Sequence, residues 1–167
     1  MKLRWWYGIV YNLILAALVV TGAVLYTHAR GWRNSAAGQN FLVVRDSDSG
    51  SIYGKWPLEE GGEFAIEFIH SVNQSPVREI FRAENRLIRS SSVRFSSFGA
   101  GMQSDLEEGQ VLSRDGDVMV LSGLTASFKE LNYIVGTVSD HLLIINGKQV
   151  SLRELCGKNA HITVYLE

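Results

Sequence analysis

A histidine, a serine and a glutamate with the chemistry of a binding site lie close together in the chain. His70 and Ser71 follow the stretch 63–69, in which apolar residues alternate with others, and Glu79 comes nine residues after His70. Alternation with a period of two is typical of a half-buried strand, so we expect His70 and Ser71 at a strand end, where binding residues often lie. If the loop 71–76 folds Glu79 back toward the imidazole, the carboxylate would raise the pKa of the histidine and orient its ring toward a ligand or a partner.

Two glycines further along the chain could add to this site. Gly99 and Gly101 permit a positive φ or a close approach of the backbone, and amides in such a turn can form a concavity that holds an anion. We therefore predict that ligand or partner binding involves the residues His70, Ser71, Ser75, Pro76, Glu79, Gly99, Ala100 and Gly101. The same residues also suit a purely architectural role, because a capped strand end, a proline turn and a glycine bulge serve a fold equally well.

Other motifs lack a residue that their chemistry requires. Asp46 and Asp48 begin like a calcium loop, but Pro57 occupies the position of the bidentate glutamate. The stretch 50–55 is one residue short of a phosphate-binding loop. No G-x-S-x-G motif supports Ser71 as the nucleophile of a hydrolase, so we expect no catalytic residue.

The composition argues against metal, redox and nucleic-acid functions. The four histidines are widely separated, and Cys156 is the single cysteine, so the spacing predicts neither a zinc site nor an internal disulfide. The formal net charge is −1, which gives no basic field for nucleic acid. We expect no metal, no cofactor and no nucleic-acid partner.

An apolar segment near the N-terminus predicts a membrane anchor. From Trp5 to Tyr26 the chain carries no charged residue. A helix of this length spans about 33 Å, enough to cross a hydrocarbon core of about 30 Å. We expect a transmembrane helix at about 5–26 within an anchor of residues 1–33, with the short basic N-terminal tail in the cytoplasm. The alternative is a signal peptide cleaved after residues 27–29, although the apolar part of a signal peptide is usually shorter, about 7–15 residues.

The predicted membrane helix has residues that suit contact with other helices. One amide side chain lies at depth, and small residues let helix backbones approach closely. The candidates for helix packing are Asn12, Ala16, Ala17, Gly22 and Ala23.

The rest of the chain is predicted to be a β-domain. Residues 34–40 are small and polar and read as a linker, which leaves 41–167 as the extracytoplasmic domain. Asp115–Gly116 and Asn146–Gly147 each lie between β-prone runs, which is a strong hairpin signal. We predict a mainly β fold, an antiparallel β-sandwich or a partly open barrel, preceded by one N-terminal transmembrane helix.

One segment of this domain fits two structures. Ser75–Pro76 and the apolar spacing after it fit the start of a helix with proline in its first position. The rival structure is a hairpin with strands at 77–83 and 87–98 around a turn at 84–86, and the alternation in its second half supports it. In either case residues 78–94 hold five arginines and two glutamates, a local charge of +3.

Two motifs in this region resemble a known family. Residues 70–79 read HSVNQSPVRE and residues 98–101 read FGAG. They resemble a family of small uncharacterised proteins encoded beside the membrane components of TAXI-type tripartite (TRAP) transporters of bacteria and archaea. The general layout matches over about 41–166, and Met102 stands where the family pattern has a leucine-like residue. The resemblance implies an all-β domain without an assigned activity, favours the hairpin, and implies association with a solute transporter.

The expected function is therefore a non-enzymatic accessory or docking subunit of a TAXI-type TRAP transporter. We expect it in the bacterial cytoplasmic membrane with its C-terminal domain periplasmic or extracellular. Its partners would be the transporter's membrane subunits, the TAXI solute-binding protein and the lipid bilayer, and the anchor would raise the effective concentration of the domain. The arginines of 78–94 could face an acidic partner or anionic headgroups, or simply keep a strand soluble. The alternative is a tethered module that binds a small anionic ligand or a metal around His70 and Glu79.

Overall fold

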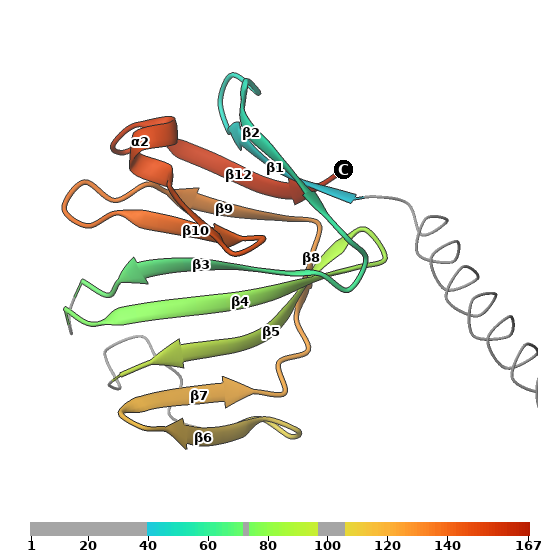
Figure 1. The fold of residues 1–167 in the computed structure, drawn as a ribbon, viewed down its shortest axis with the longest axis vertical. Coiled ribbons are helices and arrows are strands. Elements are labelled where there is room, and N and C mark those ends of the chain that lie inside the picture. The colour runs from blue at the N-terminus through green and yellow to red at the C-terminus, as the bar shows by residue number, and fades with distance from the viewer. Residues whose placement is uncertain (1–39, 72–73, 97–105) are drawn as a thin grey trace, which may run out of the picture. The chain divides into compact units, whose positions relative to one another are not determined.

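The computed structural model describes residues 40–71, 74–96 and 106–167, which form a mainly antiparallel β structure (Figure 1). The prediction of a mainly β fold is confirmed. Within these ranges no helix is long and apolar enough to cross a bilayer. The predicted anchor, most of the linker, the packing residues Asn12, Ala16, Ala17, Gly22 and Ala23, and the turn Gly99–Gly101 lie outside the described residues.

The smaller sheet has four strands in the order β2-β1-β12-β9. All of its neighbouring strands are antiparallel. Its strands are β1 (Asn40–Asp46), β2 (Ile52–Leu58), β9 (Glu130–Ile134) and β12 (His161–Leu166).

The larger sheet follows the order β11-β10-β3-β4-β5-β7-β6, and the short strand β8 (Ser127–Phe128) pairs with β5 beside this path. Its neighbours are antiparallel as well. Its other strands are β3 (Glu63–Ile69), β4 (Pro76–Glu84), β5 (Leu87–Phe95), β6 (Val111–Asp115), β7 (Val118–Ser122), β10 (His141–Ile145) and β11 (Lys148–Ser151).

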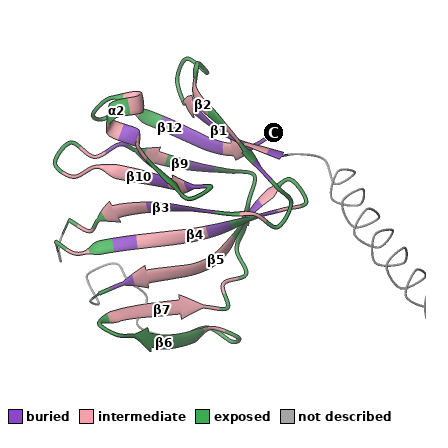
Figure 2. Cartoon of the chain, viewed as in Figure 1, coloured by how far each residue is buried: buried purple, intermediate pink, exposed green. Residues whose placement is uncertain are grey.

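One hydrophobic core lies between the two sheets, and neither sheet closes on itself. In β3 the predicted inward residues Phe64 and Ile66 are buried, but Ala65 between them is buried as well. Figure 2 shows burial along β1 and β12, whereas β6 at the end of the larger sheet is exposed throughout. The fully buried side chains include Leu42, Val44, Phe64, Ile66, Ile88, Leu143, Ile145, Ile162 and Val164.

The hairpin alternative is the correct one over the described strands β4 and β5. Strands β4 and β5 are joined by a two-residue turn at Asn85 and Arg86, whose φ angles of 53° and 62° match the right-handed twist of a hairpin. The predicted turn Asn146–Gly147 has the same geometry, with φ of 51° and 70°. The third predicted hairpin also forms, but its turn lies at Gly116–Asp117, one residue later than the signal, because Asp115 still pairs with Val118.

Four elements were not predicted from the sequence: the strands β2, β8 and β9 and the helix α2. Strand β2 contains Pro57, which has no N–H to donate. Strand β2 tolerates it because it is an edge strand with a neighbour on one side only. Strand β9 also lies at an edge of the smaller sheet. The helix α2 (Leu152–Cys156) is short and begins at Ser151, whose hydroxyl accepts a hydrogen bond from the N–H of Glu154 at 3.0 Å. The S-x-x-E spacing of these two residues is a capping signal that could have located it.

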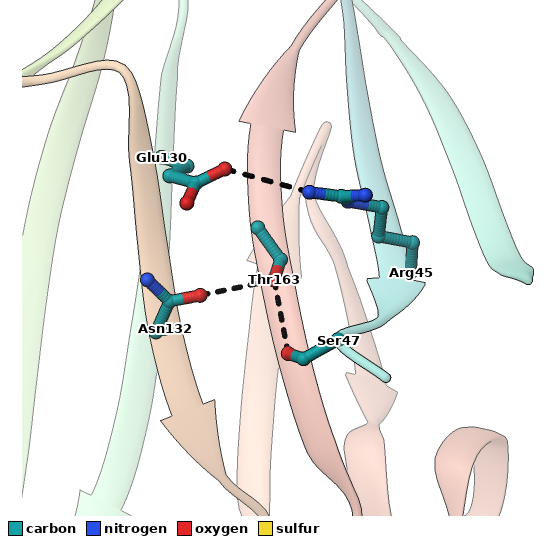
Figure 3. A network of polar contacts seen from close by, with 5 residues as sticks. All are labelled: Arg45, Ser47, Glu130, Asn132 and Thr163. Atoms are coloured by element: carbon teal, nitrogen blue, oxygen red, sulfur yellow. Dashed lines mark hydrogen bonds and ion pairs between the residues drawn. The ribbon is translucent and has the colours of Figure 1, made fainter. Parts of the chain in front are cut away.

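A polar network on the smaller sheet ties three strands together (Figure 3). Thr163 of β12 is only 2% exposed, and its hydroxyl donates to Oδ1 of Asn132 on β9 at 2.9 Å. Because the single hydroxyl proton of Thr163 is used there, Ser47 after β1 donates to Thr163 Oγ1, also at 2.9 Å. Arg45 and Glu130 form an ion pair beside it at 3.5 Å. Thr163 is therefore the centre of the network.

Replacing Thr163 by valine tests this role, since the change keeps the shape and removes the hydroxyl. We expect Thr163→Val to lower the free energy of unfolding by about 1–2 kcal/mol, because the two partly buried hydrogen bonds of the Thr163 hydroxyl are lost. The same change at the exposed Thr125 should alter it by less than about 0.5 kcal/mol. Denaturant unfolding of the full chain in mild detergent measures both, and equal stabilities for the two variants would contradict the assignment.

Candidate functional site

Glu79, one of the predicted site residues, lies between the two sheets. On β4 it stands opposite Ile66 of β3, a core residue, so its side chain points inward. Its Oε2 accepts a hydrogen bond of 2.8 Å from the hydroxyl of Tyr133, which belongs to β9 of the smaller sheet. This bond joins residues 54 positions apart and connects the two sheets across the core.

Burial changes the acid–base properties of this pair. It raises the pKa of the Glu79 carboxyl, and the hydrogen bond from Tyr133 opposes part of that increase. Burial, together with the charge of Glu79 and the hydrogen bond to it, raises the pKa of the Tyr133 phenol, so Tyr133 remains a protonated donor. Glu79 therefore holds a proton more readily than an exposed carboxyl does.

A histidine that the sequence reasoning did not select lies next to Tyr133. The rings of Tyr133 and His141 are tilted, with centroids 6.1 Å apart, and Phe68 stacks on His141 at 5.3 Å. Nδ1 of His141 accepts a hydrogen bond from the N–H of Gly136 at 3.1 Å, so a neutral ring carries its proton on Nε2. Burial lowers the pKa of His141, which favours this neutral form.

Two charged residues near His141, Asp140 and Arg153, hold the helix α2 and the loop between β9 and β10. Asp140 accepts from the hydroxyl of Ser151 at 2.5 Å and from the N–H of Arg153 at 3.0 Å. The guanidinium of Arg153 donates to the carbonyl of Gly136 at 3.1 Å. The loop between β9 and β10, whose Gly136 N–H bonds to His141, is therefore held at both Gly136 and Asp140. Among the described residues no group of three or more His, Cys, Asp or Glu side chains is placed to bind a metal.

The structure does not bring Glu79 together with His70 as the sequence suggested. In the register of β3 and β4, Glu79 lies four residues along the strand from His70, a separation of about 13 Å at ~3.3 Å per residue. The described partner of Glu79 is Tyr133. The expectation failed because the chain leaves β3 and returns along β4 in a tight loop, which places Pro76, rather than Glu79, beside the strand end.

The predicted residues His70, Ser71, Ser75 and Pro76 lie in or next to the loop between β3 and β4. The N–H of His70 donates to the carbonyl of Ser75, and the N–H of Gln74 donates to the carbonyl of His70, both at 2.9 Å. Ser71 and Pro76 are exposed, and Ser75 is half-buried. Gly99, Ala100 and Gly101 lie outside the described residues, so their part in a site remains a prediction.

A surface pocket of about 250 Å³ opens beside this loop, on the outer face of the larger sheet. It is lined by Glu67, Pro76, Arg78, Arg94, Phe95, Ser96 and Val118. Pro76 and Arg78 belong to the motif at 70–79, and Phe95 and Ser96 directly precede the segment that carries the second motif. The pocket is therefore lined by two residues of the first motif and lies close in the chain to the second.

Most of the positive charge predicted for residues 78–94 is neutralised by neighbouring strands. Both Nε and Nη2 of Arg78 contact Oε2 of Glu67 at 2.7 Å. Arg94 contacts Oδ2 of Asp115 at 2.7 Å. The other cross-strand pairs on this face are Arg82 with Glu63 and Arg89 with Glu84. In the folded domain four of the five arginines thus pair with a carboxylate, although arginines also face each other across β4 and β5.

Comparison with known proteins identifies a family for this chain. Residues 64–152 match the family described as a domain of unknown function (DUF1850), and the match covers more than half of the 167 residues. The matched region runs from β3 to the start of α2 and includes Glu79, Tyr133, His141 and the pocket. The chain belongs to this family. No curated protein and no solved structure matches it.

Sequence reasoning missed Tyr133, His141 and Arg94 for an identifiable reason. His141 was seen only as one of four scattered histidines, and Tyr133 is part of no motif. Their importance comes from contacts between strands that are distant in the chain. The alternation of Leu131 and Tyr133 in residues 130–134 was a local signal that could have placed Tyr133 on an inward face.

The raised pKa of Glu79 predicts a specific pH dependence. Because folding raises this pKa above its ordinary value of 4.5, the folded state holds the proton more tightly than the unfolded state does. The stability contributed by the proton is complete below pH 4.5 and is lost as the pH rises through the raised pKa. We expect Glu79→Gln, which keeps an acceptor for Tyr133, to show a weaker fall in stability over this range.

Denaturant unfolding of the full chain at a series of pH values measures this difference. Glu59→Gln, the same change at an exposed position, should retain the wild-type pH dependence. Tyr133→Phe should cost about 1–3 kcal/mol, since it leaves the Glu79 carboxyl without its donor. Identical pH profiles for the wild type and Glu79→Gln would show that Glu79 is not the titrating group.

Proposed function

We propose that this member of the DUF1850 family is a non-enzymatic accessory or docking subunit of a TAXI-type TRAP solute transporter. The predicted anchor at 5–26 would hold the domain 41–167 at the outer face of the bacterial cytoplasmic membrane. There it would contact the membrane subunits of the transporter and the TAXI solute-binding protein. Tethering raises the effective concentration of the domain, so a weak contact is sufficient.

The observation that carries this proposal is the exposure of the shared motif at one end of the larger sheet. In the motif at 70–79, Ser71, Gln74 and Pro76 are exposed. The motif is also held in place, because two backbone hydrogen bonds close the turn between His70 and Ser75. Exposed residues on a fixed loop contribute little to a core and suit recognition of a partner.

The charged outer face next to this loop supports the same function. Carboxylates of β3 face arginines of β4, as the pairs Glu67–Arg78 and Glu63–Arg82 show. Surface ion pairs of this kind add little to stability, typically about 0–1 kcal/mol. Charge patterns on a surface contribute more to the choice and orientation of a partner. The face is thus suited to a partner with a complementary array of charges.

Purification from native membranes tests the proposal. We expect the full-length chain, extracted in mild detergent, to retain Met1 and to carry stoichiometric transporter subunits with it. Ser71→Tyr should reduce the recovery of these subunits several-fold, because the larger side chain obstructs the exposed loop, and its melting temperature should stay unchanged. Thr125→Tyr, the matched change at another exposed hydroxyl, should leave recovery at the wild-type level.

A soluble chain that begins near Arg30 and is purified alone would contradict the proposal. Equal recovery from Ser71→Tyr and the wild type would show that docking does not use this loop.

The alternative function, binding of a small anionic ligand, is also favoured by one observation. The pocket beside the motif presents two arginine side chains, Arg78 and Arg94, rather than His70 and Glu79. The position of the alternative site therefore differs from the one that the sequence suggested.

A further inference from the structure

We propose that the pocket lined by Arg78 and Arg94 binds a small organic carboxylate. This site does not depend on the proposed docking function, and it lies on the opposite face of β4 from Glu79. Three features support this site: the placement of the two arginines, the distribution of the charges around them and the other walls of the pocket.

Arg78 and Arg94 are direct neighbours across the β4–β5 pair. Residues opposite each other in an antiparallel pair project from the same face, with Cβ atoms about 4.5–5.5 Å apart. Both side chains therefore stand side by side on the outer face, with 43% and 36% of their surface exposed. Two like charges in this arrangement repel each other, so an anion bound between them is stabilised.

The existing carboxylates lie on the far sides of the two arginines. In the strand order β3-β4-β5-β7-β6, Glu67 of β3 holds Arg78 from one side (Figure 1). Asp115, at the end of β6, holds Arg94 from the other side. Across the sheet the charged side chains follow in the order Glu67, Arg78, Arg94 and Asp115, so two positive charges lie between two negative ones. A carboxylate between the arginines would place a negative charge between the two positive ones.

The guanidinium groups keep donors for such a ligand. A guanidinium has five N–H donors in a planar fork that matches the oxygens of a carboxylate. The contacts of Arg78 with Glu67 use Nε and Nη2, and the contact of Arg94 with Asp115 uses Nη2. Asp115 is 71% exposed, so its pair with Arg94 is weak and can rearrange when a ligand enters.

The other walls specify an organic ligand rather than an inorganic anion. Pro76 and Val118 contribute apolar surface, and Ser96 adds one hydroxyl. The volume of about 250 Å³ lies below the range of about 300–1,000 Å³ typical of pockets for drug-sized ligands. A carboxylate with a short apolar chain fits these walls. Because the arginines are half-exposed, we expect a Kd on the order of 0.1–1 mM.

A ligand-observed NMR titration of the full-length chain in mild detergent tests this site, with butanoate as the probe. Butanoate should bind, whereas butanamide, which has the same size and no charge, should not. Inorganic phosphate should bind at least several-fold more weakly than butanoate, because it gains nothing from the apolar walls. No binding of butanoate, or equal binding of butanamide, would overturn the proposal. Tighter binding of phosphate would overturn the assignment of an organic ligand.

Variants then locate the binding. Arg94→Gln should weaken butanoate binding at least tenfold, whereas Arg82→Gln should not change it. Arg82 lies on the same face with its own partner, Glu63, and it does not line the pocket. Asp115→Asn should strengthen binding about threefold, because it removes a competing negative charge. Equal losses of butanoate affinity in Arg94→Gln and Arg82→Gln, or weaker binding in Asp115→Asn, would contradict the site. If a variant does not fold, the wild-type titrations with butanoate, butanamide and phosphate still test the proposal.

Discussion

The register of strand β4 between β3 and β5 is the constraint on which the described domain depends. It directs Val77, Glu79 and Phe81 toward the core and Arg78 and Arg82 toward solvent. A slip by one residue would bury the arginines and expose the apolar side chains, so the hydrophobic core fixes this register strongly. The two-residue turn at its end and the tight loop at its beginning hold β4 in place.

The same register gives β4 a different role on each of its faces. Inside, Glu79 bonds to Tyr133 and links the two sheets, and the buried carboxyl acquires a raised pKa. Outside, the preceding residue, Arg78, pairs with Glu67 and borders the pocket with Arg94. The motif at 70–79 thus encodes a strand end, a core contact and a surface group within a few residues, which explains how one short segment can serve both architecture and recognition.

What could be predicted from the sequence was local, and what could not was long-range. The turn at Asn146–Gly147 and the hairpin of β4 and β5 follow from turn chemistry and alternation, which act over a few residues. The contact of Glu79 with Tyr133 depends on how two sheets pack, and that of Arg94 with Asp115 on which strands are neighbours. The short distance between His70 and Glu79 in the chain was misleading, because β4 is extended and places Glu79 four residues along the strand from His70.

The claim that the motif loop meets the transporter is tested most directly by cross-linking in native membranes. A photoreactive amino acid placed at Ser71 would report which protein touches this loop, and the same group at Thr125 would report the background. The account predicts a cross-link from position 71 to a membrane subunit of the transporter, and none from position 125. No cross-link from position 71, or the same products from both positions, would contradict it.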